Sequence, residues 1–301
     1  MSTTNSAKGG RHMIRLSKRM SELNLCSRRE ADKYIQEGLV SVRGVPVQAM
    51  LGQKVCSREE DIKIMLDNAS EHSSLSVNSF FPQVVVLNKP LGYVSGQPEL
   101  LRRQGKEGNR YKYEPAVSLL NRSNFFAGKL SEKINIRALD FDGPRGTLSG
   151  FVPAGRLDVN STGLLVFTKS GIVAKQIISK NTSIPKEYIV RVKDVSGRSR
   201  HLNDDIDLSV LLGSDNSIKD ENRGYVPIKP LLEAKWLNEK QIRFVLLEGK
   251  KRMIRKICRQ HFDLEVTALK RTRVGQFPLD SLPIGKWRPL IEEEVQALLH
   301  F

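Results

Sequence analysis

The chain has 301 residues, 39% of them hydrophobic, so it is long enough for about two globular domains and too apolar for a disordered chain. It contains no run of about 18 apolar residues, and we therefore expect no membrane-spanning helix. Its 49 Lys and Arg residues outnumber its 33 Asp and Glu residues, which gives a net charge of +16. Such an excess favours a polyanionic partner, either nucleic acid or an anionic membrane surface.

Cysteine and histidine usage indicates neither a metal site nor a disulfide framework. The three cysteines, Cys26, Cys56 and Cys258, form no CxxC pair, and the five histidines show no metal-ligand spacing. This pattern is typical of a reducing compartment, so we expect a cytoplasmic protein without a metal. An organelle is the alternative location, because the basic N-terminus holds no acid before Glu22; it also lacks the apolar segment of a secretory signal.

The first part of the chain predicts two small helices and a hairpin. Leu16, Met20 and Leu23 recur at the spacing of one helical face. Ser27 and Glu30 form a capping box that begins a second helix, SRREADKYIQEG. Two short β-branched runs flank an Arg-Gly pair in LVSVRGVPV and predict a hairpin.

Cations occupy the polar positions of these two helices. A basic helical face is often merely solvated, but the charge of the whole chain favours contact with phosphates. We therefore predict that residues 13–66 form a small domain that contacts phosphates. Its expected phosphate contacts are Lys18, Arg19, Arg28, Arg29 and Lys33.

A serine-rich stretch separates this domain from a second one. Residues 67–82 are expected to be a linker, and residues 83–301 a second domain that begins with the buried strand QVVVLNKP. Residues 96–150 are rich in Gly, Arg, Lys and Asn with weak periodicity, and we interpret them as a long loop or insertion.

The rest of the second domain alternates many strands with few helices. This order favours an α+β fold with a mainly antiparallel sheet over a parallel one. No GxGxxG or Walker motif occurs, so no nucleotide cofactor is expected. The predicted strands are 163–168, 186–192, two within 232–249, and 264–275, and the predicted helices are 171–179, 252–262 and 291–299.

Three segments carry residues that could perform chemistry. Asp158 lies in a Gly-containing turn ahead of a strand, where its ordinary role would be to accept backbone hydrogen bonds. Tyr188 offers a flat surface for a base, and a core aromatic residue is its alternative role. The cation-rich start of the helix EGKKRMIRK predicts a phosphate site at Lys250, Lys251 and Arg252. Spacing alone does not bring these segments together.

Several ordered segments of the chain match a known pattern: LNKPLG, GRLDVNSTGLLVFTKSG, KEYIVRV, LLEGKKRMIRKIC and LKRTRVGQFPLDSLPIGKWRPL. They resemble the motifs of RsuA-type pseudouridine synthases, in the subgroup that modifies large-subunit ribosomal RNA and includes the bacterial synthase F. The earlier stretch MIRLSKRMSELNLCSRREADKYIQEGLVSVRGVPV is similar to the RNA-binding module shared with ribosomal small-subunit protein four.

The resemblance implies a role for each matching residue. Asp158 would be the catalytic carboxylate, attacking or deprotonating the ribose, after which uracil detaches, rotates and rejoins through a ring carbon. Arg156 would fill the space left by the flipped uridine. Tyr188 would stack on the uracil, Ile254 would pack beneath it, and Arg255 would pair with Asp158. The implied fold has a mixed, mainly antiparallel central sheet with the active site across it, and neither metal nor cofactor is implied.

Two other classes of protein compete with this interpretation. A non-catalytic RNA-binding or ribosome-assembly factor would keep the fold and the basic surface, but it would not need Asp158. A peripheral membrane protein would show a basic amphipathic helix with large exposed apolar residues, and the N-terminal helices do not. We therefore expect a monomeric enzyme that acts on ribosomal RNA, with transfer RNA as the alternative substrate.

Overall fold

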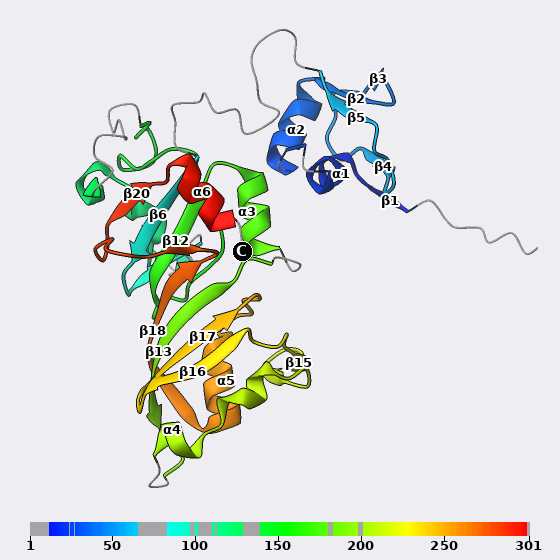
Figure 1. Ribbon diagram of the computed structural model, residues 1–301. Helices are drawn as coiled ribbons and strands as arrows, with labels where there is room; N and C mark the ends of the chain where they lie inside the picture. Colours follow the sequence, from blue (N-terminus) through cyan, green and yellow to red (C-terminus); the bar gives the residue numbers. More distant parts are fainter. Residues whose placement is uncertain are drawn as a thin grey trace, which may run out of the picture. The chain divides into compact units, whose positions relative to one another are not determined.

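The computed structural model describes residues 12–23, 25–26, 28–65, 83–96, 100–101, 110–111, 113–128, 139–179, 183–197 and 201–299. Contacts divide the chain into two compact units, one within Met1–Ser79 and one formed by Phe80–Lys169 and Val173–Phe301 (Figure 1). The predicted linker, 67–82, lies outside the described residues.

The first unit contains the predicted helices and hairpin around its own apolar core. Leu16, Met20 and Ile35 bury their side chains there, as helical spacing requires. Arg43 and Gly44 both have positive φ, which suits the tight turn between paired β2 and β3. The elements are β1 (Met13–Arg15), α1 (Leu16–Glu22), α2 (Arg28–Gln36), β2 (Val40–Val42), β3 (Val45–Pro46), β4 (Lys54–Cys56) and β5 (Ile62–Ile64).

A nine-stranded sheet organises the second unit, in the order β16-β17-β13-β18-β12-β6-β20, with β11 beside β12 and β19 beside β18. Its pairs are antiparallel except β12 with β18, which confirms the predicted mixed, mainly antiparallel sheet. The strands are β6 (Val84–Lys89), β11 (Val152–Pro153), β12 (Thr162–Thr168), β13 (Lys186–Asp194), β16 (Glu233–Asn238), β17 (Gln241–Leu246), β18 (Leu264–Val274), β19 (Phe277–Pro278) and β20 (Trp287–Pro289).

Helices cover opposite faces at the two ends of this sheet. Alternation along β6 directs Val84 and Val86 toward α3 (Gly171–Ile178) and α6 (Glu292–Leu299). Val85 and Leu87 belong to the core on the other face, where α5 (Met253–Phe262) packs (Figure 1). Two cores therefore share one sheet.

The sheet is joined in its middle by a short parallel contact that depends on one glycine. Gly163 of β12 pairs with Arg271 of β18 and has a φ of +104°. A Cβ atom at Gly163 would lie 2.2 Å from the backbone oxygen of Arg271, far inside van der Waals contact. The close approach of β12 and β18 therefore requires glycine at this position.

The described parts of the 96–150 region correct its interpretation as a loop. Ala116, Leu120 and Leu148 are buried in the core, and the carbonyl oxygen of Asn121 accepts a hydrogen bond of 2.7 Å from Trp287 Nε1. Short 3₁₀ helices lack the periodicity on which the interpretation relied. The elements here are β8 (Leu100–Leu101), β9 (Arg110–Tyr111), β10 (Glu114–Pro115), η1 (Ala116–Leu119) and η2 (Arg122–Asn124), and β10 pairs with β7 (Tyr93–Val94) just before the region.

Between β13 and β16 the chain forms elements that the sequence pattern did not predict. They are α4 (Leu202–Asp205), η5 (Leu208–Leu212) and the hairpin of β14 (Ser217–Asp220) with β15 (Gly224–Pro227). Within the described part of the chain, no helix combines the length and apolarity needed to cross a bilayer.

Candidate active site

Asp158 lies in the turn between β11 and β12, at the middle of the sheet. Several hydrogen bonds fix the backbone of this turn. Ser161 N–H donates to the Asp158 carbonyl at 3.0 Å, and Gly92 N–H donates to the Val159 carbonyl at 3.0 Å. The Asp158 side chain is 33% exposed, so its carboxylate can contact neighbouring residues and still be reached by a ligand from solvent.

A buried serine holds the residue that precedes Asp158. The hydroxyl of Ser95 donates to the Leu157 carbonyl at 2.8 Å and accepts from the Leu157 N–H at 2.9 Å. Ser95 is 5% exposed, so these bonds have little competition from water. One side chain thus satisfies both backbone groups of Leu157, although no sequence motif identified Ser95 in advance.

Arg255 comes from the first turn of α5 and meets Asp158 across the sheet. Its Nη1 donates to the Val266 carbonyl at 2.8 Å and its Nη2 to the Asn160 carbonyl at 2.7 Å. These bonds leave Nε, 4.0 Å from Asp158 Oδ2, as the group that faces the carboxylate. The predicted approach of Arg255 to Asp158 is therefore present as a long ion pair.

Burial shapes the charge of this pair. The Arg255 side chain is only 10% exposed, and its Nε is buried without a hydrogen-bond partner among the described residues. Burial and the neighbouring Arg252 charge lower the pKa of the Arg255 guanidinium, while the Asp158 charge opposes this shift. A guanidinium nevertheless stays protonated, so Asp158 faces a permanent positive charge.

Lys89 supplies a second positive group near Asp158, and the sequence assigned it no role. It is the last residue of β6, is fully buried, and its Nζ donates to the Pro90 carbonyl at 2.8 Å. Burial lowers the pKa of the Lys89 ammonium to about 8, and the negative charge of Asp158 partly offsets that shift. The only sequence signal was its place in LNKPLG.

Arg271 is a third cation that sequence reasoning missed. Its side chain is buried where β12 pairs with β18, and its Nε donates to the Leu164 carbonyl at 2.7 Å. Its Nη1 reaches the carbonyl of Arg156, in the turn of Asp158, at 3.5 Å. Arg271 therefore links the start of β12 to the turn of Asp158.

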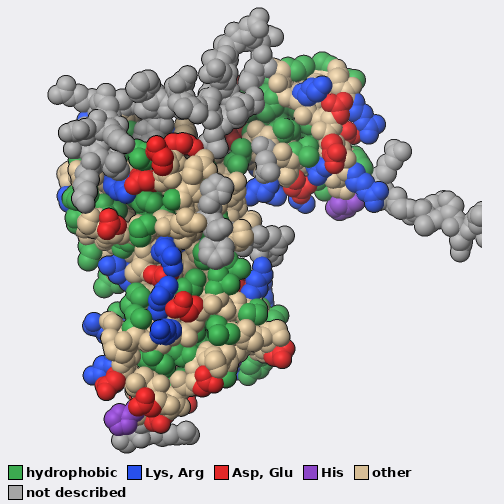
Figure 2. Space-filling model, viewed as in Figure 1, with side chains coloured by type: hydrophobic (Ala, Val, Ile, Leu, Met, Phe, Trp, Pro, Cys, Tyr) green, Lys and Arg blue, Asp and Glu red, His purple; other side chains and the backbone are tan. Residues whose placement is uncertain are grey.

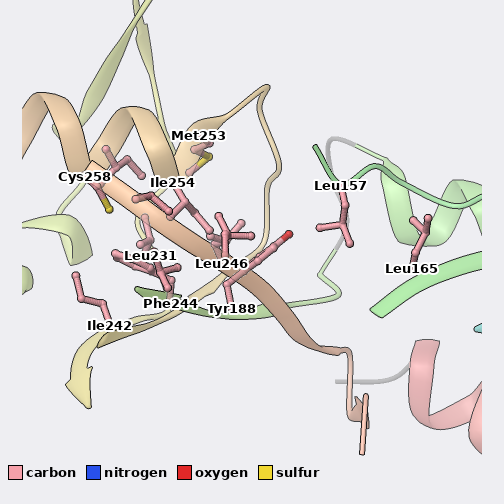
Figure 3. Close-up of a cluster of buried hydrophobic side chains, with 14 of the residues drawn as sticks. Leu157, Leu165, Tyr188, Leu231, Ile242, Phe244, Leu246, Met253, Ile254 and Cys258 are labelled. Carbon is pink, nitrogen blue, oxygen red and sulfur yellow. The ribbon is translucent and has the colours of Figure 1, made fainter. Parts of the chain in front are cut away.

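Tyr188 and Ile254 lie together on the face that carries α5. Both side chains are buried in the same core, with Leu246 beside them (Figure 3). The Tyr188 hydroxyl points away from that core toward the segment of Leu157, the residue before Asp158 (Figure 3). Tyr188 is thus a core aromatic residue and also presents its polar end toward the turn of Asp158.

The remaining predicted substrate contacts are cations that differ in their surroundings, some exposed and one hydrogen-bonded within the chain. Arg156, Lys251 and Arg252 are exposed. Lys250 Nζ donates to both Glu248 carboxylate oxygens at 2.8 Å and to a backbone carbonyl at 2.6 Å. These three contacts use the three donors of the Lys250 ammonium, so a phosphate would have to replace one of them, and its predicted phosphate contact stays a prediction.

Cations also cross the opposite face of the sheet, beside β13 and β18. Figure 2 shows Lys and Arg side chains there with acidic ones among them. Glu187 Oε2 lies 2.6 Å from Arg273 and 3.0 Å from Arg243. Part of the positive charge on this face is therefore neutralised within the chain.

The predicted RNA contacts of the first unit differ in their freedom. Arg28 and Lys33 are exposed. Lys18 lies 3.6 Å from Glu22 and Lys33 lies 3.7 Å from Glu37, each on the same helix or just beyond it. Arg19 is only 13% exposed and donates to the Glu59 carbonyl at 2.6 Å, and its predicted RNA contact stays a prediction. The side chain of Arg29 and the predicted helix cap Ser27 lie outside the described residues.

No group of three His, Cys, Asp or Glu side chains suited to a metal occurs in the described part of the chain. The chemistry that the site offers is that of one partly open carboxylate, two nearby cations and a phenol. An ionised carboxylate in such surroundings can act as a nucleophile or as a base.

Comparison with known proteins places this arrangement in a family. The family model described as RNA pseudouridylate synthase matches residues 83–260. The dual-specificity RNA pseudouridine synthase RluF of Escherichia coli strain K12 is 29% identical over 94% of this chain and 77% of its own length. The ribosomal large subunit pseudouridine synthase B of Buchnera aphidicola is 27% identical over 94% of this chain and 95% of its own.

A solved structure supports the same fold. A crystal structure of a pseudouridylate synthase superimposes with a TM-score of 0.52 over 95% of this chain and 99% of that one, at 21% identity. Because the family model covers more than half of the sequence, the chain belongs to the RNA pseudouridylate synthase family.

Proposed function

We propose that this chain converts a uridine of ribosomal RNA into pseudouridine and that Asp158 is its catalytic carboxylate. The observation that carries the proposal is the setting of Asp158: partly exposed, fixed by its turn and 4.0 Å from the buried Arg255. Arg255 and Lys89 both interact electrostatically with Asp158, so positive charge lies beside the carboxylate. The ribosomal target is supported by the name of the Buchnera relative.

The reaction is an isomerisation and needs no outside reagent. Asp158 either attacks the ribose carbon that carries uracil or removes a proton from the ribose, and in both cases the bond between ribose and the uracil nitrogen breaks. After uracil rotates, a ribose–carbon bond forms while the bond to Asp158 breaks or the removed ribose proton returns. The proton displaced from the ring carbon is balanced by one gained at the freed nitrogen. Tyr188 stacks on the uracil from the core side and its hydroxyl can carry a proton.

Exposed cations would hold the RNA around this site. Arg156 lies in the turn of Asp158, and Lys251 and Arg252 precede α5. In the first unit, Arg28 and Lys33 offer phosphate contacts, which suits a module similar to that of ribosomal small-subunit protein four. We place the activity in the cytoplasm because all three cysteines are free thiols, and we propose that the protein acts as a monomer.

Mapping of pseudouridine in cells that lack this protein tests the proposal. Ribosomal and transfer RNA from such cells would be compared after rescue with the wild type, Asp158→Asn or Arg255→Ala. We expect one site in ribosomal RNA that only the wild type restores, with both variants still binding RNA. A complete absence of dependent sites would favour a non-catalytic RNA-binding or ribosome-assembly factor, and a dependent site only in transfer RNA would change the substrate.

A further inference from the structure

A hollow lies between the β14–β15 hairpin and α5. Its volume is about 300 Å³, and an aromatic ring, a cation and polar groups line it: Ser217, Lys219, Tyr225, Gln260 and His261. The Tyr225 side chain is 74% exposed, which is high for a large residue with an apolar ring. An exposed ring beside a polar hollow is a suitable platform for a planar ligand.

Hydrogen bonds to α5 hold the hairpin in place. Gln260 Oε1 accepts from the Lys219 N–H at 2.8 Å, and His261 Nε2 lies 2.9 Å from the Ser217 carbonyl. Lys256 Nζ lies 3.0 Å from Asp220 Oδ2, which adds an ion pair. The exposure of Tyr225 is therefore imposed by a fixed hairpin.

The charge around the hollow suits an anion. Lys219 stands directly opposite Tyr225 in the hairpin, so its ammonium lies on the same face as the ring. Arg223 and Arg259 are also exposed, and neither has an ion-pair partner within 4.0 Å among the described residues. Asp215, Glu221 and Asp263 are exposed acids close in sequence to the lining residues, whereas Asp220 is paired with Lys256.

We infer that this hollow binds a nucleotide of the substrate RNA, its base stacked on Tyr225 and its phosphate on Lys219. The inference rests on the proposed action on RNA. Helix α5 connects the two places, since it carries Arg255 to Asp158 and Gln260 to the hairpin. Five helical residues rise about 7.5 Å, so RNA lying along α5 reaches both within a few nucleotides.

Binding of deproteinised, unmodified large-subunit ribosomal RNA to the full-length protein tests this inference. Tyr225→Ala should raise Kd about 5- to 100-fold through the loss of one stacked base. Tyr225→Phe keeps the ring and should bind within about twofold of the wild type. Lys219→Ala should reduce the slope of log K against log salt by about 0.7, because one phosphate contact is lost.

Ile284→Ala is the matched control, because Ile284 is an exposed apolar residue (66%) outside the hollow, and it should leave Kd unchanged. Equal Kd values for Tyr225→Ala and Ile284→Ala would overturn the inference, as would equal weakening by Tyr225→Phe and Tyr225→Ala. Pseudouridine formation by the wild type is scored separately. A wild type without activity overturns the proposed function, whereas an active wild type with an unaltered Tyr225→Ala Kd overturns the nucleotide subsite alone.

Discussion

Ser95 provides a sharp test of how the turn of Asp158 is held. Its hydroxyl forms two hydrogen bonds, of 2.8 and 2.9 Å, with the two backbone groups of Leu157. Ser95→Ala removes both bonds and introduces no bulk. Because Leu157 is buried as well, water cannot easily replace the hydroxyl.

The expected magnitude follows from the groups that lose their partner. A buried donor or acceptor left without a hydrogen bond costs about 1–3 kcal/mol, so two of them would lower the free energy of unfolding by about 2–6 kcal/mol. The turn can avoid this cost only by shifting toward solvent. A shift of about 1 Å at a catalytic group can lower the rate about 100-fold. Ser95→Ala should therefore lose stability, catalytic rate, or both.

Urea unfolding and single-turnover pseudouridine formation would measure these two effects. Ser123→Ala is the control, because its hydroxyl also forms a hydrogen bond, of 2.7 Å to Asn121, but on an exposed surface. We expect that control to change the unfolding free energy by less than about 0.5 kcal/mol. If Ser95→Ala matched the control in stability and in rate, the account of the turn would be refuted.

Three further substitutions test other parts of the structure. Gly163→Ala should lower the melting temperature sharply, because its Cβ would lie 2.2 Å from a backbone oxygen of β18. A melting temperature equal to that of the wild type would contradict the close approach of β12 and β18 at this position. The free energy of unfolding of the wild type should rise relative to that of Lys89→Met as the pH increases from about 8 to 10.5. In this range Lys89 is deprotonated in the folded protein but still protonated in the unfolded chain, so a higher pH favours the folded state. A flat difference between the two urea-unfolding curves would contradict this. Replacing Lys18, Arg28 and Arg29 with Ala should lower the affinity for RNA and reduce the slope of log K against log salt. An unchanged slope would show that these cations do not contact the RNA.

Local pattern predicted the elements that are regular over several residues. The apolar run of β12 and the alternation around Tyr188 in β13 both became central strands, as periodicity indicated. The 3₁₀ helices Ala116–Leu119 and Arg122–Asn124 escaped prediction, since runs of three or four residues show no sustained period. The β14–β15 hairpin escaped it too, and with it the exposed ring of Tyr225.

The site was harder to predict because its residues are far apart in the sequence and come together only when the strands pair. The approach of Arg255 to Asp158 came from family resemblance, and spacing gave no reason for it. Ser95 contacts a residue 62 positions away, and Arg271 one 107 positions away. Such contacts depend on strand order, which a single sequence does not specify. A buried lysine such as Lys89 looks in sequence like any strand end.

The buried cations near the joint of the sheet need an explanation beyond hydrogen bonding. Lys89, Lys186 and Arg271 are all buried, and each donates to backbone carbonyl oxygens. Neutral amide donors could satisfy the same oxygens without the cost of burying a charge, which here lowers the pKa of both lysines to about 8. Unlike a cation, a neutral amide does not add a positive charge to its surroundings. Asp158 interacts electrostatically with both Lys89 and Arg255, so the buried cations place positive charge beside the carboxylate on which the proposed chemistry depends.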